Sequence, residues 1–235
     1  MIGSRSLLLA DVAAAPGSIH LRDVTGGYGR KAVFSNLDLR VDPGEFIYVV
    51  GPSGVGKSTL LNVLYGTVRP QQGSVLVDGI AVHKLRSWQL GRIRRRIGYV
   101  FQTYELLPHL TALQNVMLPL QLAHPRLRDP RAFSVDALEL VGLKEKLKRR
   151  PGDLSAGEQQ RVAIARAIAP QPRILLADEP TGNLDSHSSA EILQLFRQLN
   201  AGGSTVVMAT HDDFVLTRYP APAVRLQGEV LRAAR

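Results

Sequence analysis

The chain has 235 residues, of which 45% are hydrophobic and 21% charged, the composition of an ordinary globular protein. It contains no cysteine, which excludes a disulfide framework and a thiolate metal site, and no apolar run approaches the ~20 residues that cross a bilayer. Lysine and arginine outnumber aspartate and glutamate by 29 to 20, and the net charge of +9 favours anionic partners such as nucleic acid or acidic lipid headgroups.

Short apolar and β-branched runs predict strands, in chain order, over 19–24, 37–41, 46–50, 74–77, 97–101, 174–177 and 205–210. LDLRV (37–41) alternates apolar and polar residues, as a half-exposed antiparallel strand does. FIYVV, ILLA and TVVMAT are continuously apolar, which is typical of strands covered on both faces. Helices are predicted over 57–65, 111–118, 131–141, 157–169 and 186–199.

The alternation of strands and helices predicts an α/β fold with a mainly parallel core sheet. The early strands are expected to form an antiparallel β side layer, and the largely helical residues 103–155 an insertion between core strands. We expect residues 1–17 to be a flexible N-terminal tail and residues 18–235 to form one domain.

A phosphate-binding loop is predicted by GPSGVGKS (51–58), which matches the pattern Gly-x-x-x-x-Gly-Lys-Ser. A strand leads into it and a helix leads out, so the helix N-terminus would direct unpaired N–H groups at the phosphates. Lys57 would reach the β- and γ-phosphates, and Ser58 would bind Mg²⁺. The pattern therefore predicts binding of a nucleoside triphosphate.

Two adjacent acids, Asp178 and Glu179, end the apolar run of RILLADEP (173–180). Carboxylates at the end of a buried strand are costly unless cations or hydrogen bonds compensate them. Beside a phosphate loop that cation is Mg²⁺, held by Asp178 directly or through water. Glu179 can then face the γ-phosphate, orient a water and accept its proton.

LSAGEQQR (154–161), here called the signature segment, begins like a helix, because Ser155 and Glu158 form a capping box. Alone it would be read only as that cap. Together with the motifs above it resembles the signature of ATP-binding cassette (ABC) ATPases. ADEPTGNLD (177–185) resembles their Walker B and D-loop, ATHD (209–212) their switch histidine and IGYVFQ (97–102) their Q-loop. The resemblance covers roughly residues 19–230 with every motif in family order.

The resemblance implies a P-loop NTPase cassette, with a helical subdomain at about 103–155, that dimerises around ATP and Mg²⁺. The catalytic residues it implies are Glu179 as general base, His211 at the γ-phosphate and Lys57. Mg²⁺ would lie among Ser58, Gln102 and Asp178. The implied nucleotide-binding residues are Tyr28, stacked on adenine, Gly51, Pro52, Ser53, Gly54, Val55, Gly56, Lys57, Ser58, Thr59, Gln102, Ser155, Gly157 and Asp185.

Three of these residues are implied to act between subunits. Ser155 and Gly157 would receive the γ-phosphate bound by the other subunit, and Asp185 would couple the two sites. Ala156 departs from the family, which usually has glycine there. It would cost about 1 kcal/mol or more if the position needs a positive φ, and nothing if it is helical.

Within the family, the chain resembles the group that includes lipoprotein-releasing, macrolide-exporting and cell-division (FtsE) ATPases, and FtsE is favoured. The implied partner is an integral membrane subunit, FtsX-like or an exporter permease, at the cytoplasmic face of the inner membrane. Leu106, Leu107 and Leu110 would contact it. The alternative within the family is a lipoprotein-releasing or macrolide-type exporter.

A soluble ABC-type ATPase acting on nucleic acid or ribosomes is the competing class. The net charge favours it, but the basic clusters at 92–96 and 144–150 lack interleaved aromatic residues, and no sequence-specific nucleic-acid binding is expected. A P-loop kinase or GTPase is the third class. The signature segment and the paired acids argue against the kinase, and no Asn-Lys-x-Asp guanine-reading motif is present.

Overall fold

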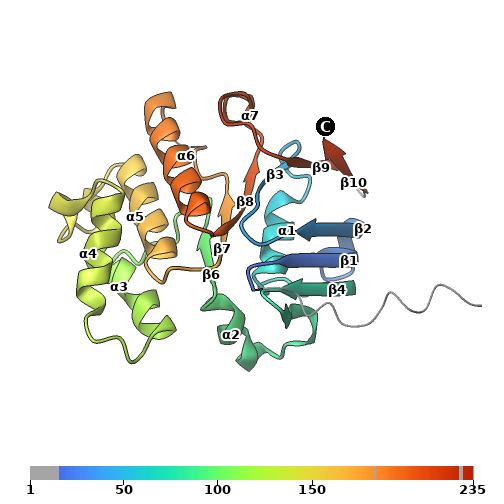
Figure 1. The fold of residues 1–235 in the computed structure, drawn as a ribbon, viewed down its shortest axis with the longest axis horizontal. Coiled ribbons are helices and arrows are strands. Elements are labelled where there is room, and N and C mark those ends of the chain that lie inside the picture. Colours follow the sequence, from blue (N-terminus) through green and yellow to red (C-terminus); the bar gives the residue numbers. More distant parts are fainter. Residues whose placement is uncertain (1–15, 183, 228–229, 235) are drawn as a thin grey trace, which may run out of the picture.

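The computed structural model describes residues 16–182, 184–227 and 230–234. Two β-sheets and a group of helices make up the fold (Figure 1). The core sheet has six strands in the order β10-β9-β3-β8-β7-β6. They are β3 (Phe46–Val50), β6 (Ile97–Val100), β7 (Ile174–Asp178), β8 (Thr205–Thr210), β9 (Ala223–Gln227) and β10 (Val230–Ala234). All neighbours pair in parallel except β10, which is antiparallel to β9.

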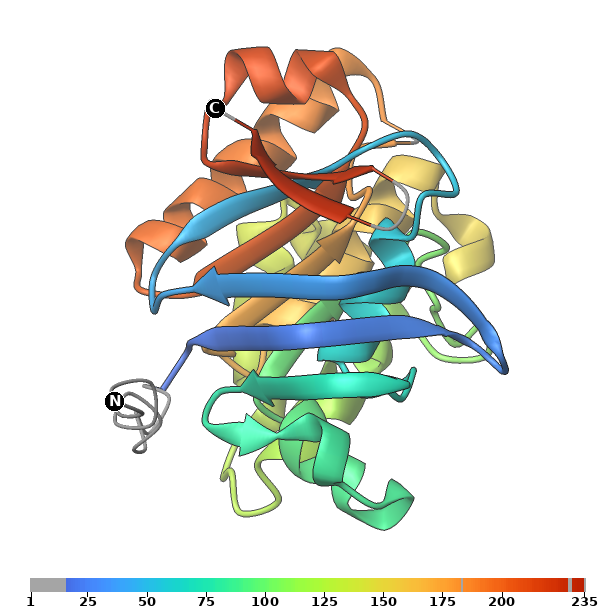
Figure 2. The same ribbon diagram turned by 90° about the vertical axis from the view of Figure 1, so that its right-hand side faces the viewer.

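The second sheet is an antiparallel side layer in the order β2-β1-β4-β5 (Figure 2). Its strands are β1 (Ile19–Tyr28), β2 (Lys31–Val41), β4 (Gln72–Val77) and β5 (Ile80–Ala81). In β2, Leu37, Leu39 and Val41 are buried while Asp38 and Arg40 are exposed. The alternation of apolar and polar residues in 37–41 therefore means that one face of this sheet packs on the core and the other faces solvent.

Helix α1 (Lys57–Leu64) lies between the sheets, in contact with β1 and β4 on one side and β7 and β8 on the other. Strands β3, β6, β7 and β8 are buried on both faces, and the period of two along a strand divides their side chains between two apolar clusters. In β3, Ile47 and Val49 pack in the cluster around α1, whereas Phe46, Tyr48 and Val50 pack in the opposite one. Because α1 packs against the core sheet in this way, its first residues lie beside the carboxyl ends of the central strands.

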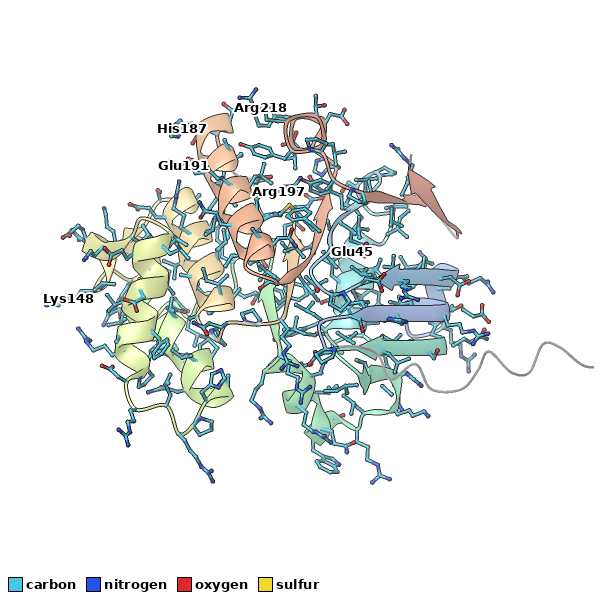
Figure 3. The ribbon with its side chains drawn as sticks, viewed as in Figure 1. Glu45, Lys148, His187, Glu191, Arg197 and Arg218 are labelled. Atoms are coloured by element: carbon cyan, nitrogen blue, oxygen red, sulfur yellow. The ribbon has the colours of Figure 1, made fainter. Side chains whose placement is uncertain are left out.

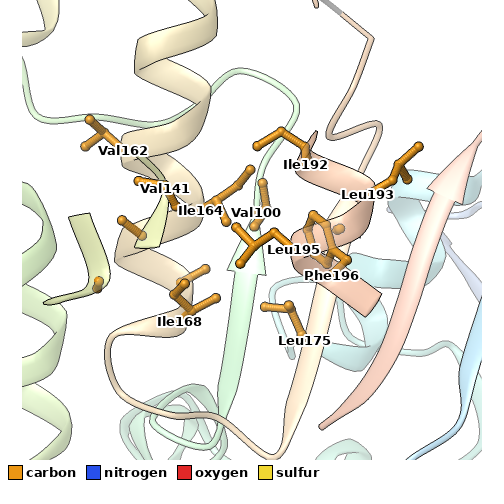
Figure 4. Packing of buried hydrophobic residues seen from close by; sticks show 14 of the residues in the cluster. Val100, Val141, Val162, Ile164, Ile168, Leu175, Ile192, Leu193, Leu195 and Phe196 are labelled. Carbon is orange, nitrogen blue, oxygen red and sulfur yellow. The ribbon is translucent and has the colours of Figure 1, made fainter. Parts of the chain in front are cut away.

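The opposite face of the core sheet is covered by helices. Their bounds are α3 (Ala112–Ala123), α4 (Pro130–Leu140), α5 (Ala156–Ile168) and α6 (Ser186–Ala201). Ile164 and Ile168 of α5 meet Leu175 of β7 and Phe196 of α6 in this cluster (Figure 4). Arg197 of α6, labelled in Figure 3, lies 4.5 Å over the Phe46 ring and donates to the Tyr219 carbonyl at 3.0 Å.

The remaining elements are short: α2 (Leu90–Arg94), α7 (Asp213–Arg218) and 3₁₀ turns at Val82–Lys84, Ser87–Gln89, Lys144–Lys146 and Pro151–Asp153. The predicted fold class, a parallel core sheet with an antiparallel side layer and a helical subdomain, is confirmed. Each predicted strand and helix has a counterpart, although β2 begins at Lys31 and not at 37. The elements α2, α7, β5, β9 and β10 were not among the predicted strands and helices.

Helix α3 differs from its prediction, because it runs past Pro119 instead of ending before it. Proline removes one helical hydrogen bond, at a cost of about 3 kcal/mol in a helix interior. Val116 and Leu120 on either side of it are buried, which keeps the helix packed through the interruption.

Of the expected N-terminal tail, residues 1–15 lie outside the described residues. Gly17 is anchored: its N–H donates to Asp78 Oδ1 at 2.7 Å, and its carbonyl accepts from Thr205 Oγ1 at 2.6 Å. Along the described chain, no helix combines the length and the apolar character needed to traverse a bilayer.

Gly98 of β6 lies close to the backbone of α5. A Cβ built there would lie 2.4 Å from the Ala167 carbonyl oxygen and 2.8 Å from Leu175 Cδ1. We expect Gly98→Ala to lower the free energy of unfolding by about 1–3 kcal/mol through overpacking, measured by urea denaturation. Gly152→Ala is the control, because a Cβ there meets nothing within 4 Å. Equal unfolding midpoints for the two variants would refute this packing argument.

Candidate functional site

A loop joins β3 to α1, and its backbone conformation suits the binding of an anion. Gly54 and Gly56 adopt φ of 78° and 111°, in the left-handed region that favours glycine. A Cβ on Gly56 would lie 2.6 Å from Val33 Cγ1, so β2 presses against the loop there. Gly56 is also the N-cap of α1, and no side chain caps this helix end. Its first-turn N–H groups can therefore receive phosphate oxygens.

Lys57 is the first residue of α1, and it is only 5% exposed because its side chain folds back against this loop. Its Nζ donates to the carbonyls of Gly51 at 2.9 Å and Pro52 at 3.2 Å, and lies 3.4 Å from Glu179 Oε1. The ammonium is thus held in place by the loop itself. When a triphosphate binds, its oxygens would replace these carbonyls as the acceptors for the Lys57 ammonium.

Asp178 ends β7 as a buried carboxylate, and its Oδ1 has no hydrogen-bond partner among the described residues. Burial raises the pKa of Asp178, the Ser58 hydroxyl and Lys57 lower it, and the negative charge of Glu179 raises it. A buried oxygen without a partner beside a serine hydroxyl suits Mg²⁺, which takes oxygen ligands from one or two carboxylates and from substrate phosphates. Ser58 and Asp178 therefore fit the ion.

Glu179 follows with φ of 47°, an uncommon conformation for a residue other than glycine. Its N–H donates to the Ala209 carbonyl at 2.9 Å, which fixes the chain as it leaves the sheet. Its Oε1 lies 2.8 Å from His211 Nδ1, and its Oε2 accepts from Gln102 Nε2 at 3.5 Å. The structure thus brings Lys57, Gln102, Glu179 and His211 together at the carboxyl ends of parallel strands, where ligands bind in α/β sheets.

Two hollows flank Glu179. One of about 190 Å³ is bounded by the loop and the first turn of α1, by Gln102 and by Glu179; the loop and helix residues are Ser53, Gly54, Gly56, Lys57, Ser58 and Thr59. The other, of about 500 Å³, is lined by Gln102, Glu179, Gly182 and His211 among others. The Glu179 carboxylate lies between the smaller hollow, which suits phosphate groups, and the larger one. It is therefore placed to act on a water that approaches the terminal phosphate.

The signature segment lines neither hollow. Ser155 is the N-cap of α5: its Oγ accepts from Glu158 N at 3.2 Å, and Glu158 Oε2 accepts from Ser155 N at 2.9 Å. Both arms of the predicted capping box are thus present. Ala156 begins the helix and is not among the residues with positive φ. Alanine therefore carries no conformational cost at this position.

Tyr28 ends β1 at the tip of its hairpin with β2 and is 58% exposed. Val33, a few residues further along β2, contacts Gly56, so this hairpin runs beside the phosphate loop. Asp185 caps α6: its Oδ1 accepts from Ser188 N at 2.9 Å and its Oδ2 from Ser188 Oγ at 2.8 Å. These bonds lower the pKa of Asp185 and orient the start of α6.

Arg166 is a residue of this region that the sequence did not single out. From the last turn of α5 it donates to the carbonyls of Tyr104, at 2.6 Å, and Glu105. Both residues have positive φ, 61° and 50°, although neither is glycine. Arg166 thereby ties the helix of the signature segment to the turn that follows Gln102. No sequence pattern reveals such side-chain to backbone bonds.

Comparison with known proteins agrees with this geometry. Residues 34–182 match the ABC transporter family. The lipoprotein-releasing system ATP-binding protein LolD of Bacteroides fragilis is 43% identical over 197 residues, covering 83% of this chain and 91% of LolD. The cell division ATP-binding protein FtsE of Streptococcus pneumoniae is 40% identical over 216 residues, covering 91% and 94%.

Solved structures of the ATP-binding cassette MJ0796 share the fold. A dimeric structure described as a post-hydrolysis state bound to ADP and Pi superposes with a TM-score of 0.84 at 38% identity, covering 92% of this chain and 99% of the other. A second dimeric structure gives a TM-score of 0.85 at 40% identity with the same coverage.

The Arg166 contacts lead to a specific expectation. Arg166→Ala removes the hydrogen bonds that a charged side chain donates to two carbonyls, and each such bond stabilises the fold by about 1.5–3 kcal/mol. Amides of residues 103–107 should then exchange hydrogen about tenfold faster or more, while exchange in β7 stays unchanged. Arg131→Ala, at an exposed position of α4, is the control. If the turn kept its protection in Arg166→Ala, these contacts would not hold it.

Proposed function

The chain belongs to the ABC transporter family and hydrolyses ATP to ADP and phosphate, and from this we propose that two copies close around two ATP molecules and drive a membrane-embedded partner. One observation carries the proposal: the phosphate loop and Glu179 form an open half of a site, and the capped N-terminus of α5 lies outside its two hollows. The dimeric state of MJ0796 supports the same arrangement.

In this proposal the phosphate loop binds the triphosphate through the α1 N-terminus and Lys57. Ser58, Asp178 and Gln102 would hold Mg²⁺, which when bound neutralises charge on the phosphates. Glu179 acts as the general base on the attacking water, because its carboxylate borders both hollows. His211, 2.8 Å from Glu179, orients that carboxylate and contacts the γ-phosphate.

The second copy completes each site. Ser155 and Gly157 would bring the N-terminus of its α5 to the γ-phosphate, and the small side chains allow the backbone to approach closely. A helical Ala156 is compatible with this role. Asp185, fixed as the cap of α6, would couple the two sites, and Tyr28 would stack on adenine from the β1–β2 hairpin.

A groove of about 500 Å³ between β6, α2, α3 and α5 is the surface we assign to the membrane partner. Tyr99 and Phe101 stack in it with ring centroids 4.1 Å apart, and Tyr65 packs against both. Phe101 precedes Gln102, and Glu105 is held by Arg166. A segment seated in the groove would therefore press on residues that flank the nucleotide site.

The leucines expected to contact the partner come after Glu105 in the chain and are not among the residues that line this groove. Leu106 packs against the core beneath the helices, whereas Leu107 is exposed. Asn115 fixes the Leu107 backbone in both directions, accepting from its N–H at 2.8 Å and donating to its carbonyl at 3.1 Å. Leu107 is thus the better placed of these two for an external contact.

Within the family we propose an FtsE-like ATPase of a cell-division complex at the cytoplasmic face of the inner membrane. The alternative is the ATPase of a lipoprotein-releasing or macrolide-type exporter, since LolD and FtsE relatives are similarly identical to this chain. Affinity capture of the Glu179→Gln protein with ATP from solubilised membranes distinguishes the two by the subunit that copurifies. Hydrolysis stimulated by DNA or ribosomes would instead support the soluble class.

Glu179→Gln tests the chemistry directly. The amide still fits the site but cannot accept a proton, so hydrolysis should fall at least about 100-fold while ATP binding is retained. The variant should then accumulate as an ATP-bound dimer, measured by size-exclusion chromatography with light scattering. The control is Glu145→Gln, in the exposed turn at Lys144–Lys146. Turnover at the wild-type rate in Glu179→Gln would show that another group is the base.

A further inference from the structure

A second surface, outside the nucleotide site, is defined by charge. Residues 79–104 contain Lys84, Arg86, Arg92, Arg94, Arg95 and Arg96 and no aspartate or glutamate. We call residues 84–96 the basic segment. It runs through the 3₁₀ turn at Ser87–Gln89 and α2, at the lower end of the molecule in Figure 1.

Apolar anchors fix this segment to the fold. Ile93 is fully buried, Val82 just before the segment is buried, and Leu85 packs against the cluster around α1. The Arg86 N–H donates to Gln89 Oε1 at 3.0 Å, which shapes the intervening turn. The basic side chains and Trp88 between these anchors are therefore presented on a fixed backbone.

Most of the cations have no acidic partner. Arg96 pairs with buried Asp78 at 2.8 Å, and Arg94 lies 5.2 Å over the Tyr65 ring. For the other four, Lys84, Arg86, Arg92 and Arg95, no carboxylate of the described chain comes within 4.0 Å. Like charges this close repel one another, and an external anionic surface would relieve that repulsion.

Trp88 stands out among the apolar side chains. It is the only tryptophan of the chain and is 77% exposed, more than any other large hydrophobic residue described. An exposed indole among arginines is typical of the membrane–water interface, where the ring enters the headgroup region and its N–H remains hydrated.

The position of the segment fits such a surface. Gly91, Arg94 and Arg95 line the groove assigned above to the membrane partner. The basic segment therefore lies on the side of the molecule that would face the bilayer, and this step rests on the proposed function.

We propose that the basic segment is a membrane-surface contact: Lys84, Arg86, Arg92 and Arg95 bind acidic phospholipid headgroups, and Trp88 enters the interface. Each such cation adds to the electrostatic attraction between the chain and an anionic leaflet. Nucleic acid fits less well, because α2 has only five residues and Trp88 is the one aromatic side chain among the cations. The contact would orient the chain at the bilayer independently of ATP.

The test uses the full chain and vesicles of phosphatidylcholine with or without phosphatidylglycerol. Because Trp88 is the sole tryptophan, its emission reports on this surface alone. We expect cosedimentation and a blue shift only with phosphatidylglycerol, both weakened by high salt. Trp88→Ala should bind more weakly.

Charge reversal provides the matched comparison. Arg86→Glu with Arg92→Glu should weaken binding to the anionic vesicles by about tenfold or more. Lys148→Glu with Arg149→Glu changes the net charge equally in the other basic cluster, and should weaken binding less than threefold or so. None of the four residues lines the nucleotide hollows or the groove, so ATP hydrolysis in solution should be unchanged in both double variants.

Three results would overturn the proposal: no binding to anionic vesicles, equal losses in the two double variants, or binding without a change in Trp88 emission. Tighter binding to a short DNA duplex, with the same emission change, would assign the surface to nucleic acid. Unchanged hydrolysis with failed vesicle binding would leave the proposed ATPase function intact. If instead the wild-type chain failed to dimerise when ATP is added, the proposed function would be undermined. The vesicle-binding result could still be interpreted, because it does not depend on ATP.

Discussion

The site depends on three charged residues: Lys57, Asp178 at the end of β7, and Glu179 directly after it. A buried ammonium faces Glu179 at 3.4 Å, and one buried oxygen of Asp178 beside it has no hydrogen-bond partner in the described part of the chain. Buried charges are stable only when paired, so this arrangement favours ligands that supply both an anion for Lys57 and a cation for Asp178. A metal–triphosphate complex supplies both. The surrounding architecture fixes the positions of these three residues relative to one another, because α1 is packed between two sheets and the parallel strands end at one edge.

Under the proposed function, the site of a single chain is incomplete. Glu179 borders two hollows that the signature segment does not line. That segment forms a second, separate feature: a helix N-terminus with small residues and a satisfied capping box. The cap and a phosphate role are compatible, because Ser155 and Glu158 orient the helix while the N–H groups of its first turn stay available. Arg166, in the same helix, holds the turn after Gln102, so a movement of α5 would reach the residues beside Glu179 and those lining the groove.

Much of this could be read from the sequence, because local patterns determine it. Apolar runs predicted the core strands and the alternation in 37–41 predicted the side layer, since burial on one or two faces dictates composition. The residues of 51–58, 178–179 and 211 were brought together as expected. What could not be read depends on tertiary contacts: helix α3 continuing through Pro119 on the strength of its buried face, and the Arg166 bonds to two carbonyls. The conformation of Ala156 also needed the structure, because both a helical and a left-handed backbone were compatible with the motif.

The central claim is that each nucleotide is enclosed by two copies of the chain. The absence of cysteine allows a direct measurement: Ser53→Cys and Ser155→Cys are introduced into separate Glu179→Gln chains, the two proteins are mixed, and disulfide formation is followed with and without Mg²⁺ and ATP. The account predicts a cross-linked heterodimer that forms only with nucleotide, because Ser53 of one chain then lies near the α5 N-terminus of the other. No cross-link with ATP bound, or one that forms equally without it, would contradict the shared site.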